Sequence, residues 1–319
     1  MKNIAACAYQ TGATGLFVIN SLRWLGLALC AVVLAACSRE EVAPKPQYTS
    51  TPGATDARTH YVFLIHPLQN PQLLHQKYEP LMNHLAEQLP GTSFDLETSS
   101  DYADFEQKLR KGGPHFALPN PYHATLARDW GYLVIAKMGN DALFRGIFIV
   151  RKDSPIREVA DLRGKVVAYP APTALAAAMM PQLYLQKNGI NVQTDIKNVY
   201  VGTHNSSIMN AYLRQSDASA TWPVAWAAFE QSNPQEAAEL KVIWQTPTLI
   251  QNAILARQGV PATVVSEVTR VLTTLQDKPA GLALLKGMDT VNFVAASDAD
   301  FEIVRTFLKE FNTLVKKEK

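Results

Sequence analysis

Short apolar runs alternate with amphipathic stretches along most of the chain. Residues 61–65 form a continuous apolar run that predicts a strand, whereas Leu81, Leu85 and Leu89 recur every fourth residue and predict a helix over residues 78–89. The alternation predicts further strands at residues 94–97, 116–118, 144–150, 166–169, 199–202, 218–221, 242–244 and 253–256. It predicts further helices at residues 102–111, 173–187, 206–214, 263–275, 280–285 and 299–316. This order favours an α/β fold with mixed, mostly parallel sheets that are flanked by helices.

Two interruptions of the pattern predict two lobes. After the strand at 144–150 the chain reads Arg-Lys-Asp-Ser-Pro, and a second group of strands and helices begins. We expect residues 59–145 plus 250–319 to form one lobe and residues 146–249 to form the other. Two chain crossings would then form a hinge that lets the lobes close on a ligand. The alternative is a single large α/β domain, which the repeated break and restart of the pattern disfavours.

The first 36 residues have the pattern of a secretory signal. Lys2 and Arg23 precede an apolar run, residues 24–36, and the segment contains no acidic residue. The run ends in Leu-Ala-Ala before Cys37, which resembles the lipobox of bacterial lipoproteins, where the cysteine accepts a diacylglyceryl group. A membrane-spanning anchor is the alternative, but the run is shorter than the roughly 20 apolar residues that a bilayer requires. We expect residues 1–36 to be removed and 37–58, rich in Pro and Thr, to form a flexible tether.

Composition narrows the function further. Of three cysteines, cleavage would leave only Cys37, so core burial rather than a disulfide must stabilise the mature chain. Loss of Lys2 and Arg23 reduces the 30 basic residues to 28, equal to the 28 acidic ones, which disfavours a nucleic-acid partner. The sequence has no phosphate-binding loop, no GxSxG elbow, no HExxH motif and no paired histidines at metal-binding spacing. We therefore expect neither an enzyme nor a bound cofactor or metal.

Four loops that run from a predicted strand into a helix hold the candidate binding residues, because open α/β sheets bind ligands at the carboxyl ends of their strands. In the first lobe the candidates are His66, Asn120 and Tyr122. In the second lobe they are Tyr169, Thr173, Ala174, His204, Asn205 and Ser206, together with Trp222 directly after a predicted strand. The rings of Tyr122 and Trp222 are expected to face the cleft, whereas Trp226 and Phe229 are expected to pack in the core.

The second-lobe loops favour an anion. Thr173 stands at a predicted helix start, where free backbone amides and the helix dipole attract negative charge. It could equally do no more than cap its own helix. Asn205 and Ser206 supply donors at another predicted helix start, and the His204 imidazole can donate to an oxyanion. Two donor-rich helix starts in one lobe predict a site for a small oxyanion.

Taken together, several segments resemble the phosphate/phosphite/phosphonate ABC-transporter substrate-binding family. They are His66-Pro-Leu-Gln-Asn-Pro, Ala117-Leu-Pro-Asn-Pro-Tyr-His, the stretch from Phe144 to Ser154, Asp161-Leu-Arg-Gly-Lys, Tyr169-Pro-Ala-Pro-Thr-Ala-Leu-Ala-Ala, the stretch from Tyr200 to Asn210, and Ala220-Thr-Trp-Pro. The resemblance covers about Tyr61 to Val315. It implies a type II periplasmic-binding-protein fold and a monomer, lipid-anchored outside the cytoplasm, that delivers phosphonate, phosphite or phosphate to a membrane permease and its ATPase.

The resemblance also implies roles for individual residues. Family members hold the anion with hydroxyls and amides at a helix start, which fall here on Thr173, and with a histidine, which falls on His204. An aromatic hydroxyl from the other lobe would come from Tyr122 or the loop at His66. Two departures stand out: Thr173 lacks the neighbouring serines and threonines of the family, and no carboxylate stands near Trp222 to hold an amine. A small or uncharged substituent is therefore expected.

The residues are also compatible with two other functions. The same fold could serve as a receptor for another small metabolite or as a sensory subunit that signals to a membrane kinase. A secreted phosphate or phosphonate ester hydrolase is a third candidate, which the lack of a nucleophile–base pair disfavours.

Overall fold

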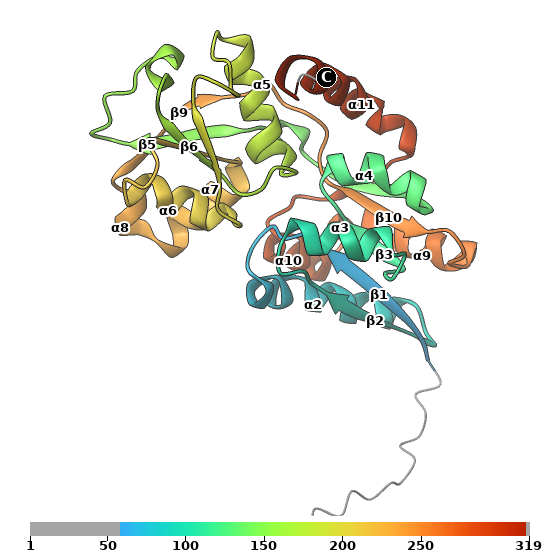
Figure 1. Cartoon of the computed structure of the whole chain (residues 1–319). Helices are drawn as coiled ribbons and strands as arrows, with labels where there is room; N and C mark the ends of the chain where they lie inside the picture. The colour runs from blue at the N-terminus through green and yellow to red at the C-terminus, as the bar shows by residue number, and fades with distance from the viewer. Residues whose placement is uncertain (1–57, 317–319) are drawn as a thin grey trace, which may run out of the picture. The chain divides into compact units, whose positions relative to one another are not determined.

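The computed structural model describes residues 58–316, so the predicted signal segment, Cys37 and all but the last residue of the predicted tether lie outside it. Strand β1 (Thr59–Ile65) lies inside a six-stranded sheet, ordered β11-β4-β10-β3-β1-β2 (Figure 1). Its last three residues are fully buried because helices cover the sheet. The other strands are β2 (Thr92–Glu97), β3 (Phe116–Leu118), β4 (Tyr132–Met138), β10 (Ala253–Arg257) and β11 (Phe293–Ala295). We call this sheet and its helices lobe 1.

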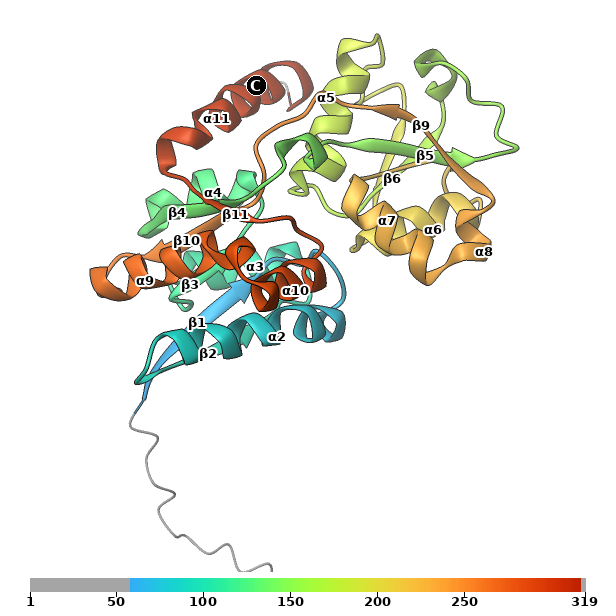
Figure 2. The same ribbon diagram turned by 180° about the vertical axis from the view of Figure 1, so that it is seen from behind.

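A second sheet has five strands in the order β7-β6-β8-β5-β9, and with its helices we call it lobe 2. Its strands are β5 (Ile147–Arg151), β6 (Val166–Tyr169), β7 (Lys197–Tyr200), β8 (Ala218–Thr221) and β9 (Leu240–Gln245). Figures 1 and 2 show the two sheets as separate bodies within the described chain.

Helices connect the strands in both lobes. In lobe 1 they are α2 (Pro71–Gln88), α3 (Tyr102–Arg110), α4 (Pro121–Ala127), α9 (Ala262–Thr273), α10 (Pro279–Gly287) and α11 (Glu302–Phe311). In lobe 2 they are the π-helix η4 (Leu175–Met179), α5 (Met180–Lys187), α6 (His204–Tyr212), α7 (Pro223–Ser232) and α8 (Pro234–Ala237). The predicted two-lobed α/β fold with helix-flanked mixed sheets is confirmed.

The balance of strand directions differs from the prediction of mostly parallel sheets. Four strand pairs are parallel, β1 with β2 and β3, and β6 with β7 and β8. The other five pairs, which involve β4, β5, β9, β10 and β11, are antiparallel. The cause lies in the chain crossings: β5 and β9 carry the chain into and out of lobe 2 side by side, so they must run in opposite directions, as must β4 and β10 in lobe 1.

The lobes are joined by two crossings, one between β4 and β5 and one between β9 and β10. Gly146 lies in the first crossing and has no room for a side chain, since an added Cβ would lie 2.5 Å from the carbonyl oxygen of Ala176. The C-terminal segment adds a third connection. Lys187 of α5 forms an ion pair with Glu310 of α11 at 2.6 Å, and Gln193 donates to the carbonyl of Val315. Figures 1 and 2 both show α11 beside α5.

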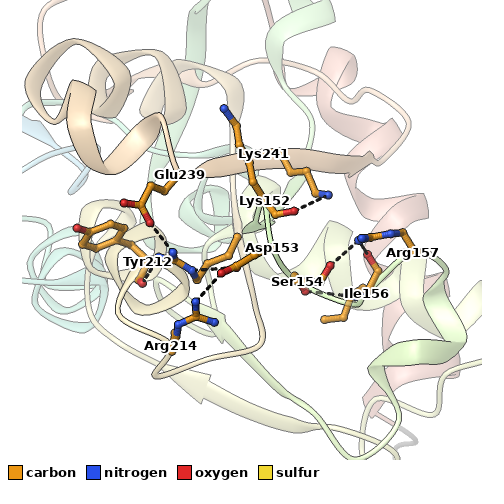
Figure 3. Close-up of polar contacts among 10 residues, drawn as sticks. Lys152, Asp153, Ser154, Ile156, Arg157, Tyr212, Arg214, Glu239 and Lys241 are labelled. Atoms are coloured by element: carbon orange, nitrogen blue, oxygen red, sulfur yellow. Dashed lines mark hydrogen bonds and ion pairs between the residues drawn. The ribbon is translucent and has the colours of Figure 1, made fainter.

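A polar network holds together the edge of lobe 2 that includes the end of β5 (Figure 3). The Arg151 guanidinium contacts Asp153 and Glu239 and donates to the carbonyl of Tyr212, while Arg214 pairs with Asp153. These contacts tie β5 to the start of β9 and the end of α6. The segment 151–154, which contributes to the family resemblance, therefore has a structural role. Each exposed ion pair stabilises the fold only slightly, but together the pairs act as a network.

Candidate functional site

A small cavity of about 20 Å³ lies between the lobes, at the carboxyl ends of β1, β3 and β8. Its volume corresponds to about one water molecule. Residues from both lobes line it: His66, Leu68, Tyr102, Asn120, Phe144, Ala174, Leu175, Ala176, Ala177, His204, Trp222 and Asn252. None of these is a lysine, arginine, aspartate or glutamate. Any anion here must therefore be held by neutral donors.

Five of the ten predicted ligand-binding residues line this cavity, namely His66, Asn120, Ala174, His204 and Trp222. The other five, Tyr122, Tyr169, Thr173, Asn205 and Ser206, do not line it.

Tyr122 is turned away by the helix on which it lies. Asn120 accepts the backbone N–H of His123 and caps α4, and Pro121 occupies the first helical position. Tyr122 thus falls on the helix, half-buried, with its ring against His123. Tyr169 is fully buried in β6, where its ring contacts Tyr200. Both are parts of their lobes rather than of the cavity wall.

The predicted helix start at Thr173 is displaced by two residues. The helical segment begins at Leu175 with Ala174 as its N-cap, and no side chain caps it. The hydroxyl of Thr173 is not part of the cavity wall, but its carbonyl accepts from the Asn120 amide at 2.9 Å. The first amides of a helix have no partner within the helix. At the start of η4 they belong to Leu175, Ala176 and Ala177, which line the cavity.

The start of α6 is already satisfied by its own cap. The Thr203 hydroxyl accepts from the Ser206 backbone N–H at 3.0 Å and donates to the Ser206 hydroxyl at 2.8 Å. Asn205 lines a neighbouring groove of about 540 Å³ that includes Lys77 and shares Leu68 and His204 with the cavity. Of the donors predicted at this helix start, only His204 reaches the cavity.

His204 is buried with both ring nitrogens engaged. Nδ1 lies 3.0 Å from the Thr221 hydroxyl, and Nε2 lies 3.2 Å from the Tyr102 hydroxyl of the other lobe. Burial lowers the pKa of His204 to about 4, so the ring is neutral near pH 7. An oxyanion would have to share the interlobe contact between His204 and Tyr102 rather than meet a free imidazolium.

Tyr102 also lines the cavity, although it is not among the residues predicted from the sequence. It is the first residue of α3 and is almost fully buried. Burial raises the pKa of its hydroxyl, which therefore stays protonated and can donate. The sequence does carry a signal for Tyr102. The segment from β2 into the predicted helix at 102–111 runs from a strand into a helix, as the four candidate loops do.

Three further polar side chains, those of Trp222, His66 and Asn252, line the cavity, and the buried Oδ1 atom of Asn252 has no partner among the described residues. The Trp222 indole is buried, and its Nε1 atom has no partner among the described residues. The His66 Nδ1 atom lies 2.8 Å from the carbonyl oxygen of Leu118, and burial lowers the pKa of His66 to about 3. A buried N–H without a partner is uncommon in folded proteins and favours a site where a ligand completes the bonding.

Two α/β lobes joined by two crossings, with donors from both lobes around a cavity between them, define a type II periplasmic binding protein. Residues 63–301 match the family described as "ABC transporter, phosphonate, periplasmic substrate-binding protein", and the chain belongs to this family. Its members are substrate-binding components of transporters, not enzymes.

Known relatives agree with this assignment. The phosphonates-binding periplasmic protein of Escherichia coli is 23% identical over 246 residues, which cover 74% of this chain and 72% of the relative. A binding-protein component of an ABC phosphonate transporter from Pseudomonas aeruginosa superposes with a TM-score of 0.74 at 18% identity, over 80% of this chain and 87% of that one. PhnD1 of Prochlorococcus marinus, solved with methylphosphonate, superposes with a TM-score of 0.73 at 17% identity, over 80% of this chain and 98% of that one. At these identities the superpositions establish the fold.

Between Arg58 and Lys316 no helix has the length and apolar character needed to cross a membrane. In the same range, no three His, Cys, Asp or Glu side chains gather closely enough to hold a metal ion.

Proposed function

We propose that this protein is the extracytoplasmic binding lipoprotein of an ABC importer, and that it captures phosphonate, phosphite or phosphate between its lobes as a monomer and delivers it to a membrane permease. The observation that carries the proposal is the cavity between the lobes, which is lined by Tyr102, by residues 175–177 at the start of η4 and by Trp222, whose buried indole N–H has no partner among the described residues. Neutral donors of this kind bind an oxyanion without a formal countercharge. The ligands named for the relatives support the same chemical class.

The lining of the cavity favours a small substituent. Leu68, Phe144 and Trp222 form its apolar part, and no carboxylate lines it that could hold an amine. Hydrogen phosphite and methylphosphonate fit these requirements better than an aminoalkyl phosphonate.

Calorimetry of the purified protein with phosphite, methylphosphonate, phosphate and 2-aminoethylphosphonate tests this. We expect dissociation constants in the micromolar range or below for at least one of the first three and weaker binding of the aminoethyl compound. Absence of binding to all four anions would reject the ligand class.

We propose Cys37 as the lipid attachment site and the residues before it as a cleaved signal. Labelling of expressing cells with a radioactive fatty acid should mark the protein, and Cys37→Ser should abolish the label. Cys30→Ser is the matched control, because Cys30 lies within the predicted signal, and it should leave the label in place. Equal labelling of the Cys37→Ser variant and the parent would contradict the anchor.

A further inference from the structure

The ring of His66 is held in one tautomer by the main chain. Its Nδ1 atom lies 2.8 Å from the carbonyl oxygen of Leu118. A carbonyl oxygen can only accept, so Nδ1 must carry the hydrogen, and in a neutral ring Nε2 is then a bare acceptor. His66 lines the cavity, and Nε2 forms no hydrogen bond with any residue between 58 and 316. The cavity therefore has a fixed acceptor in its wall.

The surroundings of His66 oppose a second proton on the ring. The rings of Tyr102 and Phe105 on α3 lie about 6 Å away, at 6.1 and 6.0 Å. His123 on α4 and His204 on α6 add to the electrostatic cost of charging it. The Glu106 carboxylate lies 3.5 Å from Nε2 of His123. Burial is the main reason that His66 stays neutral.

A fixed acceptor distinguishes between protonation states of an oxyanion. A fully ionised anion presents only lone pairs and would meet the lone pair of Nε2 unfavourably. An oxyanion that retains one P–O–H hydrogen can donate it to Nε2. Leaving a buried polar atom unpaired costs about 1–3 kcal/mol. No lysine or arginine lines the cavity to compensate the second charge of a dianion.

We propose that His66 selects singly protonated oxyanions, so that the site takes the monoanion of a phosphonate, phosphite or phosphate and rejects fully ionised anions such as alkylsulfonates. The inference rests on the proposed function, because it specifies the form of the anion that this cavity binds. The hydrogen stays on the ligand throughout, and His66 only accepts a hydrogen bond from it.

The test compares methylphosphonate with methanesulfonate, which has the same shape as the phosphonate monoanion but no acidic hydrogen. Calorimetry of the protein, purified as its host processes it, is run from pH 6 to 9. Above the second pKa of methylphosphonate the monoanion fraction falls about tenfold per pH unit, and we expect the dissociation constant to rise by the same factor. Methanesulfonate should not bind at any pH in the series.

The outcomes separate the two proposals. Methylphosphonate affinity that is constant or increases as the ligand loses its second proton overturns the role of His66 but leaves anion capture intact. Binding of methanesulfonate as tightly as methylphosphonate does the same. Absence of binding of phosphonate, phosphite and phosphate at every pH refutes the proposed function itself.

A pair of variants tests the residue. In His66→Gln the amide can rotate to present either a donor or an acceptor. Above the ligand's second pKa we therefore expect the factor by which the dissociation constant rises per pH unit to be at least threefold smaller than in the parent. His115→Gln is the matched control, because the His115 Nδ1 atom is also fixed by the main chain, at 3.0 Å from the Val62 N–H, but His115 does not line the cavity. An unchanged pH dependence in His66→Gln would refute the assignment. If that variant does not fold, the pH series on the parent protein still decides.

Discussion

The side-chain amide of Asn120 in lobe 1 donates to the carbonyl of Thr173 in lobe 2 at 2.9 Å. Its orientation is fixed, because Oδ1 of the same amide accepts the backbone N–H of His123 at the start of α4. One side chain thus both begins a helix in its own lobe and contacts the other lobe at the edge of the cavity. Asn120 therefore links the local helix start to the contact between the lobes.

Replacing Asn120 by serine should weaken ligand binding without destabilising α4. Serine caps helices about as well as asparagine but is too short to reach Thr173. Loss of one neutral hydrogen bond costs about 0.5–1.5 kcal/mol, which predicts a roughly two- to tenfold higher dissociation constant by calorimetry. Asn70→Ser is the matched control, because Asn70 caps α2 in the same way and makes no bond to lobe 2. Equal effects of both variants on binding would show that the Asn120–Thr173 contact has no role in closure.

Tyr102→Phe removes the hydroxyl that meets His204 across the cavity. If this hydroxyl donates to the bound anion, its loss should cost about 1.5–3 kcal/mol, or roughly tenfold to a hundredfold in affinity. Tyr132→Phe provides the comparison, since the Tyr132 hydroxyl is also buried but donates to the Pro114 carbonyl away from the cavity. We expect Tyr132→Phe to lower the melting temperature and leave the dissociation constant unchanged. Unaltered binding in Tyr102→Phe would exclude this hydroxyl from the site.

The sequence pattern predicts most of the fold because strands and amphipathic helices are local features. The strands β3, β6 and β8 have the predicted bounds, and each is buried at every position or nearly so. The pattern predicts no helix over residues 121–127, although asparagine followed by proline is a helix-start signal. It therefore places Tyr122 in a loop, whereas the structure places it on α4.

The cavity wall could be predicted only in part, because it depends on contacts between distant residues. Tyr102 and His204 are 102 positions apart, and nothing in either local pattern shows that their side chains meet. The π-helical start of the segment after Thr173 also has no simple sequence signal, since a stretch of alanines is compatible with several helical geometries. The pattern identifies the loops that reach the cleft, whereas packing decides which side chains face it.

Trp222→Phe should weaken binding by removing the only indole N–H at the cavity wall. The Nε1 atom of Trp222 has no partner among the described residues, so a ligand oxygen is its available acceptor. We expect at least a tenfold higher dissociation constant. Trp244→Phe makes the same change on β9, where the ring packs against Phe148 at 5.7 Å and does not line the cavity. Its dissociation constant should match that of the parent. If Trp222→Phe also matches the parent, the indole serves packing alone.

The two neutral cavity histidines should make the ligand-free protein less stable as pH falls. Burial lowers the pKa of His204 to about 4 and that of His66 to about 3, whereas the unfolded chain takes up these protons near pH 6.5. Below pH 6.5 the unfolded state therefore binds more protons, and the free energy of unfolding decreases by up to about 1.4 kcal/mol per pH unit for each histidine.

Urea unfolding without ligand between pH 5 and 7 measures this slope, in a range where most carboxylates stay ionised. His204→Gln should make the slope shallower by up to about 1.4 kcal/mol per pH unit. A slope that is the same in the variant and the parent would mean that His204 takes up its proton equally in the folded and unfolded chain. At least one of the two cavity histidines would then not be held neutral, as the inferred selection of monoanions requires.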